Sequence, residues 1–194
     1  MQQLLRDYIN RVTSSIMPDE EYKFLVDAFS LKLVRKKKFL LHEGSICTYM
    51  AFIARGAMKQ YFTDEKGIEH IVRFGIEGWW MSDRESFVSL TPSRYTIEAV
   101  EDCDLLVTTP EKMAQLKKNS PSFVKLGQIL DERSYIASQK RIEATISYTA
   151  GEKVIYLMES NPEFLHRFPQ NMLASYLGLS PETLSRVRKQ LLSK

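Results

Sequence analysis

The sequence has few of the residues on which many protein chemistries depend. It contains two cysteines, Cys47 and Cys103, too few for a disulfide framework or a cysteine-rich zinc or iron–sulfur site. Its three histidines include no closely spaced pair, which argues against the histidine-rich metal centre of a cupin-type enzyme. Its eight glycines form neither a P-loop nor a dinucleotide-binding motif, and no candidate nucleophile has a histidine beside it. We therefore expect no enzymatic activity, with no catalytic residue and no metal site.

Long hydrophobic runs are also absent. A helix that spans a bilayer needs about 20 apolar residues, and the longest candidate, residues 46–54, is interrupted by Thr48 and Tyr49. The first residues include Arg6 and Asp7 and lack the apolar segment of a signal peptide. We therefore expect a cytoplasmic protein with no membrane partner.

Positive charge is concentrated at one end of the chain. The net charge is +3. The last 29 residues, which include Arg167 and Lys194, hold five Lys and Arg against Glu182 alone, a net charge of +4. The other 165 residues therefore carry a net charge of −1. This asymmetry is typical of a chain that presents one end to a polyanion.

The first two thirds of the chain change from helical to β periodicity and back. Apolar residues at helical spacing predict helices within residues 1–30. Short alternating runs from Leu31 onward predict strands, and the turn Asp64–Gly67 predicts a β-hairpin. The predicted strands include residues 50–55, 58–63, 68–74, 95–100 and 104–108. Residues 75–94 are expected to form a loop, and this pattern favours an antiparallel sandwich or roll.

Helical periodicity returns after Pro110. We expect a short helix over residues 110–118, a long one over 121–148 and another over 151–160. On the long helix an apolar residue recurs every seven positions: Phe123, Leu130, Ala137 and Ala144. This repeat favours pairing with a helix of a second copy, and the alternative is packing on its own domain.

The last 25 residues have the pattern of a helix-turn-helix. Ala174 is small enough to let two short helices cross closely, and Gly178 can adopt the positive φ that the turn requires. Ser180 and Pro181 suit the N-cap and first turn of the second helix. The positions between the two helices are apolar: Leu173, Leu177, Leu179, Leu184 and Val187.

The second of these helices presents side chains that suit double-stranded DNA. Arginine pairs with guanine, glutamate accepts from the cytosine amine, and serine, threonine and lysine hold phosphates. The predicted DNA-binding residues are Ser180, Glu182, Thr183, Ser185, Arg186, Arg188 and Lys189. The alternative is a helical hairpin with a basic face and no DNA partner.

From end to end the chain resembles the Crp/Fnr superfamily of bacterial transcription regulators. Residues 41–45 resemble the strand and turn that enter its β-roll, residues 64–67 its hairpin, and residues 180–186 the start of its recognition helix. The resemblance implies an α+β fold: an N-terminal antiparallel β-roll of the cyclic-nucleotide-binding jelly-roll type with flanking helices, a long dimerisation helix and a C-terminal helix-turn-helix domain. It implies a sensor domain at 1–120, a dimerisation helix at 121–148 and a DNA-binding domain at 149–194. It also implies a homodimer in which Glu182 and Arg186 read the bases.

The expected effector loop departs from the family pattern. Relatives that bind cyclic nucleotides have Gly-Glu and then Arg-Ser, where the glutamate takes the ribose hydroxyl and the arginine the phosphate. Here residues 77–82 lack a glutamate after the glycine, and the later pair is inverted to Ser93-Arg94. We therefore expect an unidentified small-molecule effector other than cyclic AMP and no firmly assigned cofactor. The expected effector pocket consists of Gly78, Trp79, Trp80, Ser82, Ser93, Arg94 and Tyr95.

Many relatives add a β-hairpin wing after the recognition helix. The sequence given ends six residues after Arg188, so we expect no wing and a shallower salt dependence of DNA binding. This leaves open a ligand-binding or protein-interaction module of the same fold that does not bind DNA.

Overall fold

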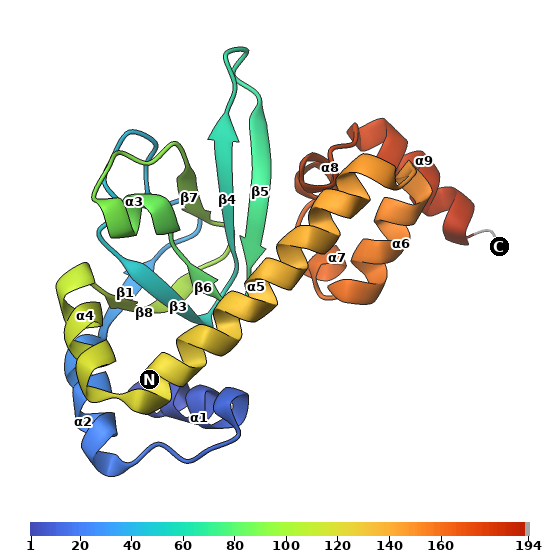
Figure 1. Cartoon of the computed structure of the whole chain (residues 1–194). Coiled ribbons are helices and arrows are strands. Elements are labelled where there is room, and N and C mark those ends of the chain that lie inside the picture. The colour runs from blue at the N-terminus through green and yellow to red at the C-terminus, as the bar shows by residue number, and fades with distance from the viewer. Residues whose placement is uncertain (193–194) are drawn as a thin grey trace.

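The chain forms a β-roll, a group of N-terminal helices and a C-terminal helical unit (Figure 1). A computed structural model describes residues 1–192, so Lys194 of the charge count lies outside the described residues. The helices are α1 (Gln2–Thr13), α2 (Asp19–Ala28), α3 (Arg84–Ser89), α4 (Pro110–Asn119), α5 (Pro121–Ser147), α6 (Ala150–Ser160), α7 (Phe164–Arg167), α8 (Gln170–Leu177) and α9 (Pro181–Leu192). The long helix predicted over 121–148 is α5, which runs from the roll to the C-terminal unit (Figure 1).

The roll consists of two four-stranded antiparallel sheets. The strands are β1 (Ser30–Val34), β2 (Phe39–Leu41), β3 (Met50–Arg55), β4 (Met58–Thr63), β5 (Glu69–Gly75), β6 (Trp80–Met81), β7 (Thr96–Ala99) and β8 (Cys103–Thr108). One sheet has the strand order β1-β8-β3-β6 and the other β2-β7-β4-β5. The predicted α+β class with an antiparallel roll is therefore confirmed, and its core is apolar, with Phe52, Ile53 and Leu105 almost fully buried.

The predicted hairpin is also confirmed. Strands β4 and β5 pair antiparallel and extend beyond the rest of the roll (Figure 1). The Asp64 carboxylate closes the turn by accepting hydrogen bonds from the backbone N–H groups of Lys66 and Ile68, both at 2.9 Å. Gly67 has a φ of 79°, which explains the need for glycine at this position.

The prediction that residues 75–94 form a loop was wrong in part. This segment contains the short strand β6 and the helix α3. Asp83 is the N-cap of α3, since its carboxylate accepts a hydrogen bond from the Ser86 N–H. These elements are only two and six residues long, too short to show a clear hydrophobic periodicity among the turn-forming residues of the segment.

Part of the apolar repeat of α5 packs on its own chain, and the predicted pairing with a helix of a second copy stays a prediction. Phe123 is buried in the main core, and Leu130 packs against that core. Ala144 is 7% exposed within the chain, whereas Ala137 is exposed. The repeat therefore mainly marks the side of α5 that packs on its own chain, which was the alternative interpretation.

Both cysteines are buried free thiols. Within residues 1–192, no helix combines the length and the hydrophobicity that a bilayer crossing requires.

Candidate functional site

The turn between α8 and α9 has the geometry that the sequence predicted. Gly178 has a φ of 65°, and its N–H donates to the Ser175 carbonyl at 3.1 Å. The Leu179 N–H donates to the Ala174 carbonyl at 2.9 Å, which completes a Schellman-type end of α8. The Ser180 hydroxyl then accepts from the Thr183 N–H at 3.2 Å and caps α9. The two helices are thus joined by a short turn, with hydrogen bonds that close the end of α8 and the start of α9.

The interface between α8 and α9 is tightly packed. Ala174 is fully buried, Leu173 and Leu184 are each 1% exposed, and Val187 is 8% exposed. A methyl-sized side chain at Ala174 fits the role predicted for it, because a larger one would have to enter a filled core.

Replacing Ala174 by leucine should therefore destabilise the C-terminal unit. We expect a loss of about 1–3 kcal/mol from overpacking, measured as a lower Tm or urea midpoint. The control is Asn171→Leu, which adds a leucine at an exposed position of the same helix and should leave stability nearly unchanged. Equal stability of the two variants would contradict the close crossing at Ala174.

The predicted DNA-binding side chains lie on the outer side of α9. Glu182, Ser185, Arg186 and Lys189 are exposed, whereas Thr183 and Arg188 are half-buried and Ser180 forms the cap. Hydrogen bonds from its own backbone N–H and from Ser180 hold the pKa of Glu182 below its usual value, so it is ionised at neutral pH. The structure therefore groups cations, hydroxyls and one acid on a single accessible helix.

Polar side chains in and around the predicted effector loop form hydrogen bonds within the protein. The Ser93 hydroxyl donates to the Asp83 carboxylate at 2.6 Å, and both side chains are buried. Ser86 accepts from the Cys47 N–H at 2.8 Å and donates to the Thr91 carbonyl. Sequence reasoning missed Asp83, although an aspartate at the start of a short polar segment is a typical N-cap. Asp83 and Ser93 thus tie α3 to the roll.

Trp79 and Trp80 pack against other aromatic rings. The ring centroids of Trp80 lie 5.2 Å from Phe52 and 5.9 Å from Phe29, both core residues. Trp79 lies 5.6 Å from Phe164 of the C-terminal unit. Both indoles therefore contribute to packing within the protein.

The other predicted pocket residues are more open. Gly78 has a φ of 81° and Ser82 is half-buried. Arg94 is exposed, and its guanidinium carbon lies 5.3 Å from the centroid of Phe62 and 5.6 Å from that of Tyr95. Arg94 thus rests on aromatic rings and forms no ion pair with any residue that the structure describes.

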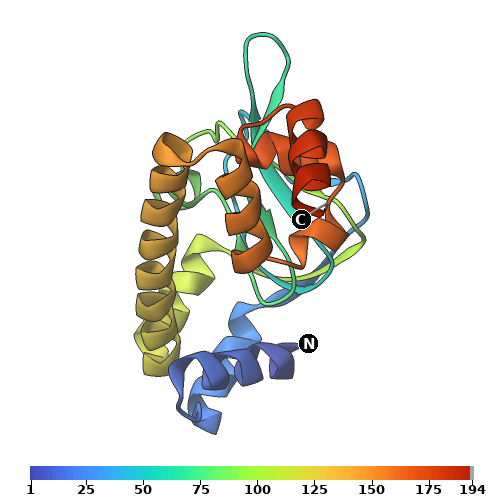
Figure 2. The ribbon, with the colours of Figure 1, turned by 90° about the vertical axis from the view of Figure 1, so that its right-hand side faces the viewer.

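The C-terminal unit is docked on the roll through α8 and β5, which is an edge strand (Figure 2). The Ser175 hydroxyl accepts from the Ile71 N–H at 3.0 Å and donates to the Glu69 carbonyl at 2.9 Å. Arg141 of α5 donates to the Val72 carbonyl and, at 3.3 Å, to the Tyr176 carbonyl. Side chains therefore satisfy part of the edge of β5 that would otherwise be open.

Aromatic packing supports the same docking. The ring of Phe74 on β5 stacks on Phe168 with a centroid distance of 3.9 Å. Tyr176 and Phe164 lie 4.9 and 5.4 Å from the same ring. These residues join the roll and the C-terminal helices in a second apolar core.

Arg167 forms an ionic clasp between the two parts, which we define as Arg167 with Glu77 and Glu101. Its guanidinium donates to both Glu101 oxygens at 2.7 Å and to the Glu77 oxygens at 3.0 and 3.1 Å. The two carboxylates, Glu101 first, raise the pKa of Arg167. Burial acts to raise the pKa of Glu77, but Arg167 and the Gly56 N–H outweigh it and lower that pKa. The sequence analysis did not find this clasp.

No group of three or more potential metal ligands lies together within the described residues.

In a comparison with known proteins, a family model matches the roll. Residues 31–120, from β1 to the end of α4, match the family described as the cyclic nucleotide-binding domain. No curated protein sequence matches this chain.

Solved structures share the arrangement of most of the chain. FixK2 from Bradyrhizobium japonicum is 21% identical, with a TM-score of 0.66 over 85% of both chains. A CooA mutant from Carboxydothermus hydrogenoformans is 15% identical, with a TM-score of 0.70 over 87% of this chain and 78% of that one. A putative Crp/Fnr-family regulator from Eubacterium rectale is 18% identical, with a TM-score of 0.65 over 89% and 82%. Residues 31–120 are thus similar to a cyclic nucleotide-binding domain, and the chain has the fold seen in Crp/Fnr-type regulators.

Proposed function

We propose that this protein is a dimeric transcription regulator that binds double-stranded DNA through α9. The observation that carries the proposal is the exposed Arg186, with Glu182 and Lys189, on a helix whose opposite side is held by buried Leu184 and Val187. A helix of this kind enters the major groove with its N-terminal residues at the base edges. The similar fold of Crp/Fnr-type regulators supports the proposal.

The proposed readout divides the residues into two groups. Arg186 donates two hydrogen bonds to a guanine, and Glu182 accepts from a cytosine amine. Ser185, Arg188 and Lys189 contact phosphates and orient the helix without reading sequence. Ser180 and Thr183 act mainly by shaping the start of α9, because they already bond to each other.

The proposed dimer contact is an exposed apolar stripe on α5, which we define as Tyr135, Ile142 and Ile146. Their spacing of seven and four residues places them on one face of the helix. Their exposures are 66%, 53% and 80%. Two copies paired along this stripe would bring two α9 helices into one particle, as two half-sites of a duplex require.

The proposed domain organisation has the boundaries expected from the sequence: a sensor domain at 1–120, a dimerisation helix at 121–148 and a DNA-binding domain at 149–194. We propose that a small molecule bound in the roll shifts the balance between arrangements of the α9 pair. The docking of α8 on β5 supports this, since the sensor and the DNA-binding unit share one apolar core. The proposal involves no catalytic step.

The decisive experiment selects bound sequences from random duplexes with the full chain. We expect enrichment of a two-fold symmetric site whose half-sites lie about 10 base pairs apart. Arg186→Ala should reduce the preference for the selected over a random duplex by roughly 5- to 150-fold, equivalent to about 1–3 kcal/mol. Lys189→Ala should weaken binding to both duplexes equally and lower the salt slope by about one.

The two variants are matched, since both remove one exposed cation from the same helix. No enrichment by the wild-type protein, or wild-type preference in Arg186→Ala, would overturn the assignment of α9. The first result would favour a ligand-binding or protein-interaction module that does not use DNA.

A further inference from the structure

The turn between β1 and β2 carries the longest run of positive charge in the sequence. We define the basic turn as Arg35, Lys36, Lys37 and Lys38, all of which are exposed. Arg35 is paired with Asp102 at 2.9 Å, whereas the three lysines form no ion pair with any residue in the range 1–192. The roll therefore presents three uncompensated cations at one point of its surface.

The backbone of the basic turn is held in an unusual conformation. Lys37 has a φ of 64°, in the left-handed region that favours glycine. The Lys37 N–H donates to the Ala99 carbonyl at 2.7 Å, and the Lys36 N–H donates to the Asp102 carboxylate at 2.8 Å. Strained positions of this kind persist where the surrounding structure fixes them, and they are concentrated at functional sites. The lysines are thus fixed in place by the roll rather than carried by a loose loop.

The basic turn adjoins the C-terminal unit. Asp102, which holds the turn, directly follows Glu101 of the ionic clasp. Glu101 in turn binds Arg167 of the C-terminal unit at 2.7 Å. Because Arg35 pairs with Asp102 and Arg167 with Glu101, these two acids are already engaged and do not offset the lysines. The three cations therefore lie on the roll but close to the unit that carries α9.

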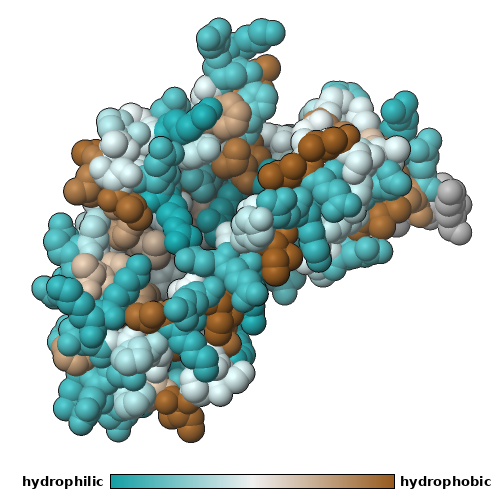
Figure 3. Space-filling model, in the orientation of Figure 1, coloured by the Kyte–Doolittle hydropathy of each residue, from teal (hydrophilic) through white to brown (hydrophobic). Residues whose placement is uncertain are grey.

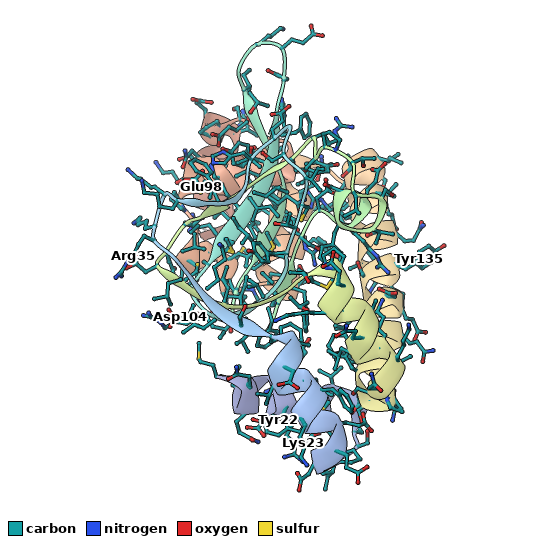
Figure 4. All side chains as sticks on the ribbon, turned by 90° about the vertical axis from the view of Figure 1, so that its left-hand side faces the viewer. Tyr22, Lys23, Arg35, Glu98, Asp104 and Tyr135 are labelled. Carbon is teal, nitrogen blue, oxygen red and sulfur yellow. The ribbon has the colours of Figure 1, made fainter. Side chains whose placement is uncertain are left out.

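The basic turn also lies on the side of the molecule away from the proposed dimer contact. The apolar stripe of α5 runs along the C-terminal half of that helix (Figure 3). In Figure 4, Arg35 and Tyr135, which belongs to the stripe, point outward at opposite edges of the molecule. A duplex bound by the two α9 helices of a dimer would extend past each half-site away from the second copy. Its outer segments would therefore run toward the side that carries the basic turn.

We propose that Lys36, Lys37 and Lys38 bind phosphates of the duplex outside each half-site, so that the sensor roll contacts DNA directly. This inference rests on the proposed function and adds to it a second DNA-binding surface, formed by the roll rather than by α9. Lysine contacts to phosphates carry no sequence information, so they add affinity without changing the selected sequence. Each neutralised phosphate also releases counterions, which steepens the salt dependence of binding.

The test compares two duplexes that contain the same selected site. One ends about two base pairs beyond the half-sites, and the other continues for about ten base pairs, one helical turn, at each end. In fluorescence anisotropy at about 0.1 M salt, the wild-type chain should bind the longer duplex roughly tenfold more tightly. Its salt slope on the longer duplex should be steeper by about 0.9 for each additional phosphate neutralised.

The basic-turn variant carries Lys36→Gln, Lys37→Gly and Lys38→Gln. Glycine suits the positive φ of Lys37, so this variant should fold. It should bind both duplexes alike, with the wild-type affinity for the shorter one. The matched control changes three exposed lysines of α4, which lies at the end of α5 remote from the C-terminal unit (Figure 1), to glutamine: Lys112, Lys117 and Lys118. Because this α4 variant loses the same charge at another place, it should keep the preference for the longer duplex.

Equal binding of the two duplexes by the wild type overturns the proposal, and so does an unchanged preference in the basic-turn variant or an equal loss in the α4 variant. A wild type that selects no site overturns the proposed function instead. Binding of the two variants to a random duplex of about 40 base pairs then tests the lysines alone, because phosphate contacts need no particular sequence. Equal affinities of the two variants for that duplex would overturn the proposal and leave the basic turn as a solvated sheet edge.

Discussion

Replacing Ile142 and Ile146 together by glutamate is expected to make the protein monomeric and to weaken its binding to a two-half-site duplex by about 100-fold or more. Two charges per copy would face each other across the stripe that we propose as the dimer contact. A monomer loses the effective concentration that a bound first half-site gives to the second helix, which is worth about 100- to 10,000-fold.

The structure favours this stripe over other parts of α5. Apolar side chains gather along the C-terminal half of α5 in Figure 3, and Figure 4 shows Tyr135 pointing outward from the helix. Ile142 and Ile146 also line a hollow of about 430 Å³ beside Val72 of β5. Apolar side chains this exposed along one helix face are typical of a contact with another chain.

Sedimentation velocity at micromolar concentration measures the oligomeric state, and fluorescence anisotropy measures DNA binding. The matched pair of single variants is Ile146→Glu and Ile136→Glu. Ile136 is 48% exposed but lies about 100° around the helix from Tyr135, so its variant should remain a dimer. A monomeric wild type, or loss of the dimer in Ile136→Glu alone, would refute this choice of face.

The helix-turn-helix could be predicted from sequence because its determinants are local. Gly178, Ser180 and Ala174 act within a few residues of their own positions, through a positive φ, a cap and a close crossing. The hairpin turn at Asp64 follows for the same reason. Such features depend on propensity and spacing, which a single sequence displays directly.

The apolar repeat of α5 shows where sequence reasoning leaves two outcomes open. A seven-residue apolar repeat fits pairing with a second helix and packing on the roll equally well, and the structure uses Phe123 for the roll. The exposed stripe of Tyr135, Ile142 and Ile146 is not evident from the sequence, because Gln139 and other polar residues interrupt it. A pattern shows which residues seek burial, but the partner is fixed by the tertiary structure.

The ionic clasp shows a second limit. Arg167 lies 90 residues from Glu77 and 66 from Glu101 in sequence, so no local pattern joins them. Long-range polar contacts of this kind can be recognised only in the three-dimensional structure.

Replacing Arg167 by alanine is expected to loosen the docking of the C-terminal unit on the roll. Four hydrogen bonds are lost, and two carboxylates are left close to an apolar core. Because these side chains are 27–42% exposed, we expect about 1–2 kcal/mol, or a roughly tenfold larger undocked population.

The Ile71 N–H reports this change locally, since Ser175 of α8 accepts its hydrogen bond only while the unit is docked. Its amide exchange should become roughly tenfold faster in Arg167→Ala. The control is Arg35→Ala, which breaks an exposed ion pair with Asp102 and should leave exchange at Ile71 unchanged. Equal exchange in the wild type and both variants would show that the clasp does not hold the unit in place.

Acidification should have the same effect as Arg167→Ala, with a sign fixed by Glu77. Its pKa in the folded protein is lowered from 4.5, because burial, which raises it, is outweighed by Arg167 together with backbone N–H hydrogen bonds that include the one from Gly56. The stability that Glu77 adds is therefore fully present above 4.5 and is lost as the pH falls through the lower folded value. Opening at Ile71, after correction for the intrinsic pH dependence of exchange, should rise over that range in the wild type. In Arg167→Ala the ion pair is already gone, so the corrected opening should depend less on pH, and an equal dependence would exclude Glu77 as the group that titrates.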